Sequence, residues 1–343
     1  MLLKTSLALC PKAETRTLSL VIRDSNVSLI ACGTSFHSGL VAKYWLEDIA
    51  KIPCNVEVAS EYRYRHPLVL DGTLFVTISQ SGETADTLEA LKIAKKINNK
   101  IHTLCICNSA ESSITRNSDL TFLTHAGPEI GVASTKAFTT QLVALALLTC
   151  SIGVVNRTIN KQNERAIVNG LKRLPGLINE TLLQEDQIKE LATRFKNKNS
   201  ALFLGRGTMH AIAMEGALKL KEISYIHAEA YPAGELKHGP IALIDENMPV
   251  IAIAPNDELL DKLKSNLQEV KSRGSQMIVF EDRDSKVKPM KAMEVIQITS
   301  NLGRITAPII FTIPLQLLSY HVSLIKGTNV DKPRNLAKSV TVE

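Results

Sequence analysis

The sequence predicts an α/β protein with two similar lobes, each a parallel sheet with helices on both faces. Its 343 residues are too many for one typical core and suit two α/β domains. Hydrophobic residues make up 45% of the chain and aromatic residues only 4%, as in sheets whose central strands are apolar on both faces. Apolar strand patterns alternate with helical patterns, and the same alternation occurs twice along the chain.

The internal repeat contains three expected strands and two expected helices in each copy. The first pair, 27–34 with 201–208, is a strand that runs into a turn; the other paired strands are 74–79 with 249–254 and 102–107 with 276–280. The paired helices are 37–49 with 211–222 and 86–96 with 258–272, and a short segment, 59–63, matches 233–237. Such alternation builds parallel sheets with right-handed crossovers.

The repeat divides the chain into five segments. They are a lead-in with a helical pattern (1–26), a first lobe (27–155), a helical connector (156–198), a second lobe (199–325) and a C-terminal tail (326–343). Pro175 and Gly176 predict a break in the polar connector. A packed helix is expected over 307–325, at the end of the second lobe.

The most informative motif is the serine loop, 79–84 (SQSGET), which joins an apolar strand to a helix. A strand that ends in this way presents free backbone N–H groups and the positive end of the helix dipole to one point. Further hydrogen bonds are available from the hydroxyls of Ser79, Ser81, Thr84 and Thr87. Because no lysine follows the glycine, the loop differs from a nucleotide P-loop. We therefore expect a small phosphorylated ligand rather than ATP.

The second copy of the repeat has diverged at this position. It carries 254–257 (APND), which lacks the hydroxyls and has gained a carboxylate that repels phosphate. Only the first lobe is therefore expected to bind the anion.

The net charge and the cysteines indicate which class of ligand the protein binds and in which cellular compartment it works. The net charge of +6 is spread along the chain without a long basic run, which favours an anionic small molecule over a nucleic acid. The six cysteines lack metal-ligand spacing. We interpret them as reduced and mostly buried, which predicts a cytoplasmic protein without a metal site. Nothing in the sequence indicates a cofactor.

Hydropathy argues against association with a membrane. The longest uncharged apolar stretch, 141–155, is shorter than the roughly 20 residues that span a bilayer. We expect it to be a buried core helix. The N-terminus shows no basic segment followed by an apolar core and a cleavage site, so no secretion signal is expected.

Five strings in this chain resemble one family. They are 32–35 (CGTS), 79–84 (SQSGET), 129–136 (EIGVASTK), 235–240 (ELKHGP) and 336–343 (LAKSVTVE). From about residue 28 to residue 343, the chain resembles the sugar-isomerase (SIS) half of the glutamine–fructose-6-phosphate aminotransferases, also called glucosamine-6-phosphate synthases. The serine loop would fit any sugar-isomerase domain, whereas the strings around His238 and Lys338 point to this family.

The resemblance implies two flavodoxin-like lobes, fructose 6-phosphate as substrate, glucosamine 6-phosphate as product, and a homodimer with the active site at the subunit contact. Members of the family normally begin with a glutaminase domain whose nucleophile is an N-terminal cysteine. Here Met1 is followed by Leu2, and 1–26 do not match the usual helical lead-in. We therefore expect ammonia from a glutaminase domain or partner, and the chain to be either a fragment of a longer enzyme or a stand-alone isomerase.

Lys338 is the candidate nucleophile. Isomerisation of a 2-keto sugar needs ring opening, removal of a C1 proton and its return at C2, and an amine that attacks the ketone acidifies that proton through an iminium. The resemblance assigns this amine to Lys338, which the tail must deliver to the site. Arg334, four residues earlier, can fix the tail or lie near the anionic substrate. The alternative for Lys338 is a solvated lysine near the C-terminus.

Glu222 resembles the base that moves the proton between the two carbons. Glu215, Lys219 and Glu222 have spacings that place them on neighbouring strips of one helix face. Lys219 can lower the pKa of Glu222 or stabilise charge on the enediol oxygen. The alternative is ordinary surface ion pairing, although the apolar neighbours of Lys219 leave little of the helix facing water.

His238 is the candidate for ring opening, because an imidazole near neutrality can take the hydroxyl proton and protonate the ring oxygen. It lies in a turn signal, 237–240 (KHGP), that places it on a loop. The resemblance implies that His238 enters the active site of the partner subunit. Most single histidines are structural or exposed, and His37, His66 and His321 lack a comparable context.

Hydroxyl and backbone groups near the strand ends are candidates for sugar contacts. Thr34 and Ser35 follow the first strand, and Val132 and Ser134 lie in an uncharged loop before a buried helix. Both segments can lie at the carboxyl edge of the sheet, where α/β proteins bind ligands. The expected substrate-binding set is completed by Ser79, Gln80, Ser81 and Thr84. Hydroxyl-rich loops are more often plain helix caps, a role that is compatible with substrate contact.

Several functions are compatible with these residues. The leading one is the isomerase domain of a glucosamine-6-phosphate synthase. Without ammonia, the same residues could interconvert fructose 6-phosphate and glucose 6-phosphate, as a stand-alone hexose-phosphate isomerase does. A non-catalytic sugar-phosphate sensor would need only the anion site, so the joint presence of Glu222, His238 and Lys338 disfavours it. The strings around His238 and Lys338 also disfavour a deglycase acting on fructosyl-amine phosphates.

Overall fold

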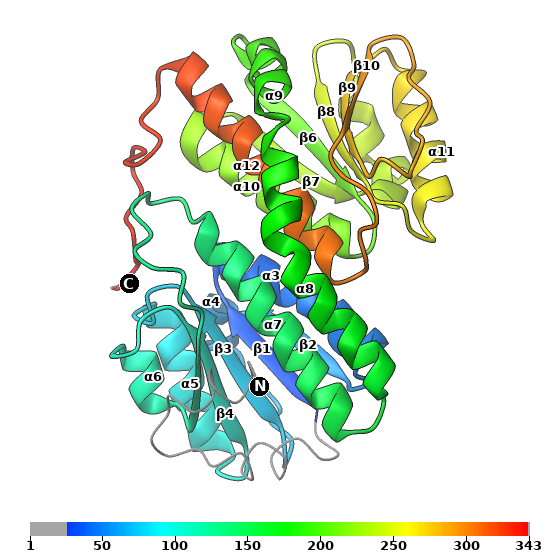
Figure 1. The fold of residues 1–343 in the computed structure, drawn as a ribbon. Helices are drawn as coiled ribbons and strands as arrows, with labels where there is room; N and C mark the ends of the chain where they lie inside the picture. Colours follow the sequence, from blue (N-terminus) through cyan, green and yellow to red (C-terminus); the bar gives the residue numbers. More distant parts are fainter. Residues whose placement is uncertain (1–25, 342–343) are drawn as a thin grey trace. The chain divides into compact units, whose positions relative to one another are not determined.

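The computed structural model describes residues 26–341, so the expected lead-in helix and Cys10 lie outside the described residues. The described chain forms two compact units (Figure 1). Unit 1 comprises 26–167 with 337–341, and unit 2 comprises 168–336. The division falls within helix α8 (Lys161–Leu182), and the last described residues of the tail belong to unit 1.

Unit 1 is a five-stranded parallel sheet with the strand order β2-β1-β3-β4-β5. Its strands are β1 (Val27–Ala31), β2 (Cys54–Val58), β3 (Leu74–Ser79), β4 (His102–Cys107) and β5 (Leu120–Leu123). Its helices are α3 (Gly33–Asp48), α4 (Ala59–Tyr62), α5 (Ala85–Ile97), α6 (Ser113–Asn117) and α7 (Lys136–Val155). The central strand β3 is buried along its whole length, because both faces of the sheet are covered.

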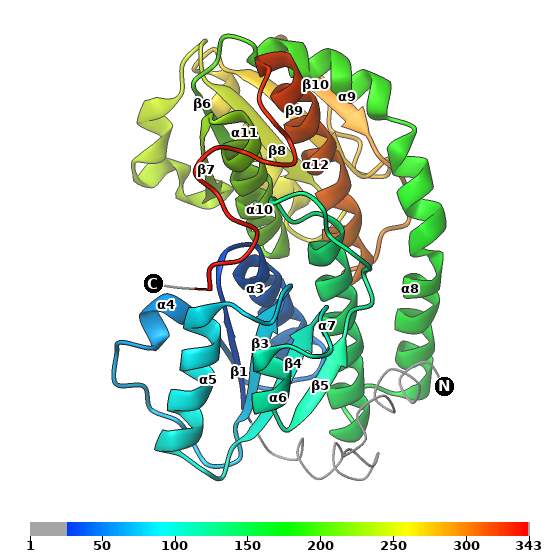
Figure 2. The same ribbon diagram turned by 90° about the vertical axis from the view of Figure 1, so that its left-hand side faces the viewer.

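Helices pack on both faces of this sheet, as the sequence predicts. On one face, Ala90 of α5 and Ile114 of α6 share a core with Phe75 of β3. On the other face, a Cβ at Gly39 of α3 would lie only 3.1 Å from Val56 Cγ1, so the helix lies very close to the strands. Helix α7 packs beside α3. Figure 2 shows α5 to one side of the strands and α7 to the other.

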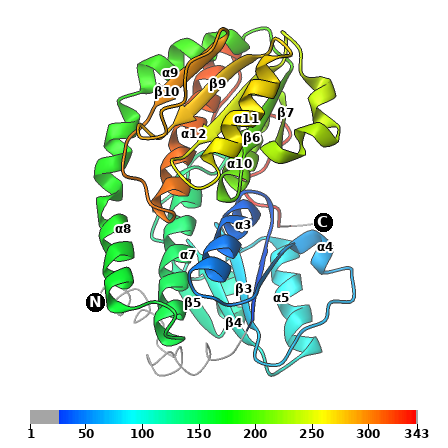
Figure 3. The ribbon, with the colours of Figure 1, turned by 90° about the vertical axis from the view of Figure 1, so that its right-hand side faces the viewer.

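Unit 2 repeats the design with the strand order β10-β9-β8-β6-β7, again all parallel. Its strands are β6 (Ser200–Gly205), β7 (His227–Pro232), β8 (Pro249–Ala254), β9 (Gln276–Glu281) and β10 (Met293–Gln297). Its helices are α9 (Glu185–Ala192), α10 (Thr208–Ser224), α11 (Leu260–Lys271) and α12 (Thr306–Lys326), with 3-10 turns η1 (Thr193–Phe195), η2 (Ala233–His238) and η3 (Pro240–Leu243). Figure 3 shows α11 on one face of this sheet, with α10 and α12 on the other.

Both sheets have the flavodoxin-like strand order, so in each lobe the order reverses beside the first strand of the repeat. In open α/β sheets, ligands bind beyond the carboxyl ends of the strands at that reversal. In unit 1 the reversal lies between β1 and β3, and the loops that leave these strands carry 32–35 and 80–84. The fold therefore brings the serine loop to the position where this class of sheet binds ligands.

Most expected elements are confirmed, and those that the sequence did not predict share one property. The strands expected at 74–79, 102–107 and 249–254 have the observed bounds. The sequence did not predict β2, β5, β7 and β10, and all four are edge strands. An edge strand is only half covered, so its sequence carries a weaker apolar signal than that of a central strand.

The break expected at Pro175 is wrong. Helix α8 continues through Pro175 for 22 residues. A proline removes one backbone hydrogen bond and crowds the preceding turn. The burial of Leu174 and Leu177 on the same helix stabilises the segment despite that loss.

Two helices, α7 and α12, are long and apolar enough to cross a membrane by length and composition. Helix α7 begins at Lys136, before the expected stretch 141–155, and so reaches 20 residues. Most of the apolar window is buried inside the protein in both cases, 61% in α7 and 67% in α12. This burial favours the core helix that the sequence predicts at 141–155.

Two glycines give a matched test of the packing in unit 2. A Cβ at Gly205, at the end of β6, would overlap the backbone carbonyl of Met209 and lie 2.6 Å from the backbone nitrogen of His210. We expect Gly205→Ala to destabilise the fold by about 1–3 kcal/mol, as overpacking does. Gly176 lies in α8, and a Cβ added there would meet nothing within 4 Å. Gly176→Ala should therefore stabilise the helix by up to about 1 kcal/mol.

Thermal unfolding of the two variants beside the wild type provides the measurement. A lower Tm for Gly205→Ala and an equal or higher Tm for Gly176→Ala are expected. An unchanged Tm for Gly205→Ala would contradict the close approach of β6 and α10.

Candidate functional site

The serine loop is a closed turn held by its own side chains. The Ser79 hydroxyl oxygen accepts a hydrogen bond from the Gly82 N–H at 3.0 Å and lies 3.1 Å from Thr84 Oγ1. The Ser81 hydroxyl oxygen accepts from the Glu83 N–H at 3.2 Å. Gly82 has a φ of +69°, a conformation that glycine adopts without strain. The sequence SQSGET therefore specifies the turn as well as the hydroxyl groups that it displays.

Backbone amides of helix α6 hold this loop through hydrogen bonds. The Ile114 N–H donates to the Gly82 carbonyl at 3.0 Å, and the Ser113 N–H donates to Glu83 Oε1 at 2.8 Å. The hydrogen bonds from Ser113 lower the pKa of Glu83. The carboxylate of the loop is thus engaged by a backbone amide of α6, which reduces its repulsion of a bound anion.

The expectation of free amide groups at this loop is wrong for Gly82, Glu83 and Ala85. The first two donate to serine hydroxyls within the loop. The Ala85 N–H, at the start of α5, donates to the Val340 carbonyl of the tail at 3.1 Å. At these three positions the loop therefore offers an anion hydroxyl donors and the dipole of α5 rather than the free amides that the sequence predicts.

Thr87 and Gln80 have structural roles that the sequence did not reveal. Thr87 is fully buried, with its hydroxyl 3.9 Å from Cys32 Sγ, so it links α5 to the end of β1 rather than facing a ligand. The Gln80 carbonyl accepts from the Asn108 N–H at 3.3 Å, which ties the loop to the end of β4. These contacts join three strand ends of unit 1 into one surface.

The tail brings Lys338 into unit 1. Its Nζ donates to the Gly131 carbonyl at 2.5 Å, and the side chain is partly buried. The bond from Ala85 to Val340 attaches the tail a second time, at the start of α5. Lys338 is therefore not a fully solvated terminal lysine. Its amine lies in the same unit as the serine loop and contacts the segment that precedes α7.

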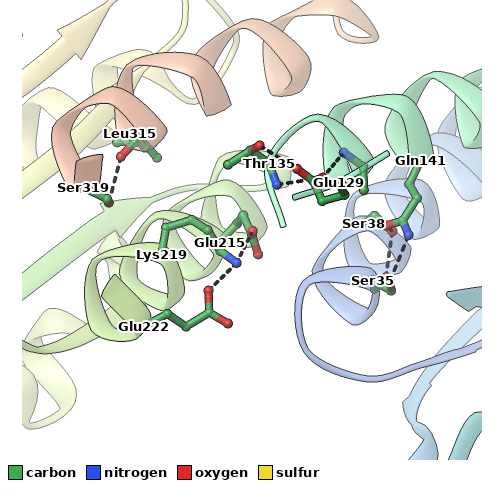
Figure 4. Close-up of polar contacts among 11 residues, drawn as sticks. Ser35, Ser38, Glu129, Thr135, Gln141, Glu215, Lys219, Glu222, Leu315 and Ser319 are labelled. Atoms are coloured by element: carbon green, nitrogen blue, oxygen red, sulfur yellow. Dashed lines mark hydrogen bonds and ion pairs between the residues drawn. The ribbon is translucent and has the colours of Figure 1, made fainter. Parts of the chain in front are cut away.

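Glu129 shapes that segment. Glu129 Oε2 accepts from the backbone N–H groups of Thr135 at 3.2 Å and Ala137 at 2.8 Å, and Oε1 accepts from the Thr135 hydroxyl at 3.1 Å (Figure 4). A carboxylate at this position satisfies amides that have no partner within α7 and complements the helix dipole. The closed segment carries Gly131 with the predicted contacts Val132 and Ser134, both partly buried.

The predicted residues Thr34 and Ser35 lie in the first turn of α3, directly after β1. Thr34 is partly buried and Ser35 is 9% exposed. The first strand end and the serine loop are adjacent because β1 and β3 are neighbours in the sheet. Unit 1 thus brings together Thr34, Ser35, the serine loop, the 129–135 segment and Lys338.

Unit 2 contains the predicted cluster on α10. Lys219 Nζ lies 3.4 Å from Glu215 Oε1 and forms an ion pair with Glu222 (Figure 4). Lys219 and Glu215 are only 2% and 1% exposed, so the alternative of surface ion pairing is wrong for them. Burial alone would lower the pKa of Lys219, but the two carboxylates outweigh it and the net pKa is raised. Lys219 is therefore held as an ammonium, and the partly exposed Glu222 is the accessible carboxylate of the cluster.

The other predicted residues of unit 2 lie on its surface. His238 is exposed at the end of η2, before Gly239 with its φ of +130°. The adjacent Lys237 forms an ion pair with Glu269 of α11 at 2.8 Å. The Arg334 guanidinium stacks 4.2 Å from the ring centre of Tyr225, and the Arg334 N–H donates to the Tyr225 hydroxyl at 2.8 Å. Of its two expected roles, fixing the tail is the one that these contacts support.

Five cysteines are free thiols among residues 26–341, and four of them are buried. Within the same residues, no group of three or more histidine, cysteine, aspartate or glutamate side chains could hold a metal ion. Cys107 lies under the serine loop, where its Sγ is 3.7 Å from the Gln80 carbonyl oxygen.

Comparison with known proteins identifies the family. A model of the SIS domain matches residues 20–151 and 194–326. The solved C-terminal domain of glucosamine-fructose-6-phosphate aminotransferase from Francisella tularensis is 52% identical, with a TM-score of 0.90 over 93% of this chain and 89% of that one. The chain belongs to the SIS family that includes this domain. The resemblance noted in the sequence is therefore confirmed.

Curated relatives of this SIS chain carry a consistent name. Glutamine–fructose-6-phosphate aminotransferase (isomerizing) of Pseudomonas syringae is 60% identical over 318 residues, and that of Neisseria meningitidis is 58% identical over 318 residues. Each match covers 93% of this chain and 52% of the relative. The chain thus spans about half the length of the curated relatives that it matches. A glucosamine-6-phosphate deaminase from Thermotoga maritima shares the fold, with a TM-score of 0.74 at 23% identity.

The sequence does not reveal the roles of four residues that contact the candidate site residues or the loops that carry them, namely Glu83, Glu129, Gly131 and Gln141. Gln141 carried a usable signal, because it is a large polar residue at the start of the long apolar stretch 141–155. The roles of Glu83 and Glu129 depend on contacts with α6 and α7 that the sequence does not reveal. Gly131 acts through its backbone carbonyl, which has no sequence signature.

Gly82→Ala tests whether the turn is needed for anion binding. The new Cβ would overlap Ser112 Oγ and lie 2.8 Å from Cys107 Sγ, and the positive φ would be strained. We expect inorganic phosphate to raise the Tm of the wild type, and the variant to fold but to lose that rise. Gly127→Ala is the matched control, because Gly127 has a similar φ of +68° and its Cβ would meet only Lys136 Nζ at 3.9 Å.

A normal phosphate response in Gly82→Ala would show that the observed turn is not the anion site. Loss of the response in both variants would show that backbone strain, and not the loop itself, causes the effect.

Proposed function

We propose that this chain is the isomerase half of a glucosamine-6-phosphate synthase, which converts fructose 6-phosphate and ammonia to glucosamine 6-phosphate. The observation that carries the proposal is the attachment of Lys338 to Gly131, in the unit that also holds the serine loop. An anion site and a primary amine in one compact unit suit a ligand with a phosphate at one end and a ketone toward the other. The names of the relatives and of the matching solved domain support this choice.

The substrate contacts are proposed from unit 1. Ser79, Gln80, Ser81 and Thr84 would hold the phosphate, with the start of α5 supplying a favourable dipole. Thr34, Ser35, Val132 and Ser134 would contact the sugar hydroxyls and carbonyl. The attachment of the tail to both α5 and the 129–135 segment would keep Lys338 at a constant distance from the phosphate.

The proposed chemistry begins with ring opening. His238, contributed by the partner subunit of a homodimer, would take the anomeric hydroxyl proton and protonate the ring oxygen. The Lys338 amine would then add to the C2 ketone, and loss of water would give an iminium. Ammonia would add at C2 and displace the lysine, leaving an imine at that carbon.

Proton transfer would complete the conversion. Glu222 would remove a proton from C1, which gives an enamine between C1 and C2, and would return that proton to C2. The hydroxyl proton on O1 would leave, and C1 would become the aldehyde of glucosamine 6-phosphate. Lys219, held as an ammonium between Glu215 and Glu222, would stabilise the negative charge that develops on the oxygen.

Ammonia would come from a glutaminase domain or partner, and the enzyme would act in the cytoplasm. Free thiols at the described cysteines fit a reducing compartment. No cofactor, metal or nucleic acid has a role in the proposed reaction.

The direct experiment is incubation of the purified chain with fructose 6-phosphate, with and without ammonium, followed by identification of the sugar. Glucosamine 6-phosphate formed only with ammonium supports the proposal. Glucose 6-phosphate in both reactions would instead identify a stand-alone isomerase. Binding without conversion would identify a sensor.

Lys338→Ala is expected to abolish turnover and to leave fructose 6-phosphate binding within about tenfold of the wild type, since it removes one polar contact. Sodium borohydride should trap the iminium in the wild type as a covalent adduct on Lys338, seen by mass spectrometry. Lys332→Ala, an exposed lysine on the same tail, is the control and should trap normally. Unchanged product formation by Lys338→Ala would remove Lys338 from the mechanism.

Glu222→Gln separates the two chemical steps. The amide cannot act as a base, so product formation and exchange of the C1 proton with solvent should both stop. Borohydride trapping on Lys338 should persist, because iminium formation precedes the proton transfer. Continued C1 exchange in D2O, measured by NMR, would assign the base to another residue.

A further inference from the structure

The side-chain amide of Gln141 is buried and contacts Ser35. Gln141 is 2% exposed, on the second turn of α7, where most neighbouring core residues are apolar. Its Nε2 donates to Ser35 Oγ at 3.0 Å (Figure 4). The Ser38 hydroxyl donates to the Ser35 carbonyl at 2.7 Å and lies 3.5 Å from Gln141 Oε1. All three residues belong to unit 1.

This contact determines what the Ser35 hydroxyl can offer to a ligand. A hydroxyl group has one proton to donate and two lone pairs that accept. The Gln141 N–H occupies one lone pair of Ser35. The proton of Ser35 therefore remains available, and the bond from the amide polarises the hydroxyl and strengthens it as a donor.

The position of Ser35 fits that role. It lies in the first turn of α3, after β1 and beside the loop that leaves β3. The start of a helix favours negative charge and electron-rich oxygen atoms. A buried amide costs free energy unless it is hydrogen-bonded, so a leucine would be the simpler occupant of this core position. Its contact with Ser35 provides the compensation.

We propose that Gln141 is a positioning residue that holds the Ser35 hydroxyl as a hydrogen-bond donor to an oxygen of the bound sugar phosphate. Gln141 itself does not touch the ligand. This inference rests on the proposed function, since it takes fructose 6-phosphate as the ligand of unit 1.

The test is a double-mutant cycle with Gln141→Leu and Ser35→Ala. Leucine is similar in size to glutamine, so the core should remain filled and the Tm should stay close to that of the wild type. We expect each single variant to bind fructose 6-phosphate roughly tenfold more weakly, the effect of one hydrogen bond to a charged or polarised group. The double variant should bind no more weakly than Ser35→Ala alone, because Gln141 acts through Ser35.

Affinity is measured by isothermal titration calorimetry with fructose 6-phosphate, in the absence of ammonium. Thr149→Val is the matched control. Thr149 is buried on the same helix, and its hydroxyl donates to the Leu145 carbonyl at 2.9 Å. This control removes a buried polar group from α7 without altering Ser35, so it should bind as the wild type does.

If the wild type binds fructose 6-phosphate, three results would overturn the inference. Gln141→Leu could bind as tightly as the wild type while Ser35→Ala binds weakly, which would separate the two residues. The losses in the double variant could be additive, which would give Gln141 an effect of its own. Thr149→Val could lose as much affinity as Gln141→Leu, which would make the effect a general one of the helix. If the wild type does not bind fructose 6-phosphate, the proposed function fails first, and this inference fails with it.

Discussion

The attachment of the C-terminal tail to unit 1 is the contact on which the proposed site depends. Lys338 donates to the carbonyl of Gly131, and the Val340 carbonyl accepts from the first amide of α5. These two bonds join the tail to the 129–135 segment and to the start of α5, which follows the serine loop. Without them, the position of the Lys338 amine relative to the serine loop would not be fixed, and the proposed attack on a bound sugar would lose the advantage of a held geometry.

The two lobes share one strand order but have diverged in chemistry. Unit 1 presents hydroxyl groups at the strand end where the sheet order reverses, and the corresponding strand end of unit 2 is followed by Pro255 and Asp257. Unit 2 instead buries an ion cluster within α10, where Lys219 is stabilised as an ammonium by two carboxylates. The two copies thus keep one sheet while their loops and helix faces differ, because function depends on loops and helix faces rather than on the sheet.

The sequence predicted the central strands and the serine loop well, for physical reasons. Strands such as β3 and β8 are covered on both faces, so their apolar runs are unambiguous. The edge strands were not predicted because their sequences are only half apolar. The helix through Pro175 was not predicted because local propensity favoured a break, whereas burial of Leu174 and Leu177 stabilises the continuous helix.

The parts of the candidate site that consist of side chains could be predicted from the sequence, whereas the contacts made by backbone groups could not. Hydroxyl groups at 79–84 and the cluster around Lys219 were identified from residue type and spacing. The occupied amides of Gly82 and Ala85, and the acceptor carbonyl of Gly131, were not, because any residue type supplies the same backbone groups.

The central claim is that the serine loop holds the phosphate and leaves the ketone end of the sugar for the amine of the tail. A crystal structure of the chain with fructose 6-phosphate tests it most directly. We expect the phosphate on the hydroxyls of Ser79, Ser81 and Thr84, with C2 within bonding reach of Lys338 Nζ. A phosphate bound beyond β8 in the second lobe, with the serine loop empty at saturating ligand, would contradict it.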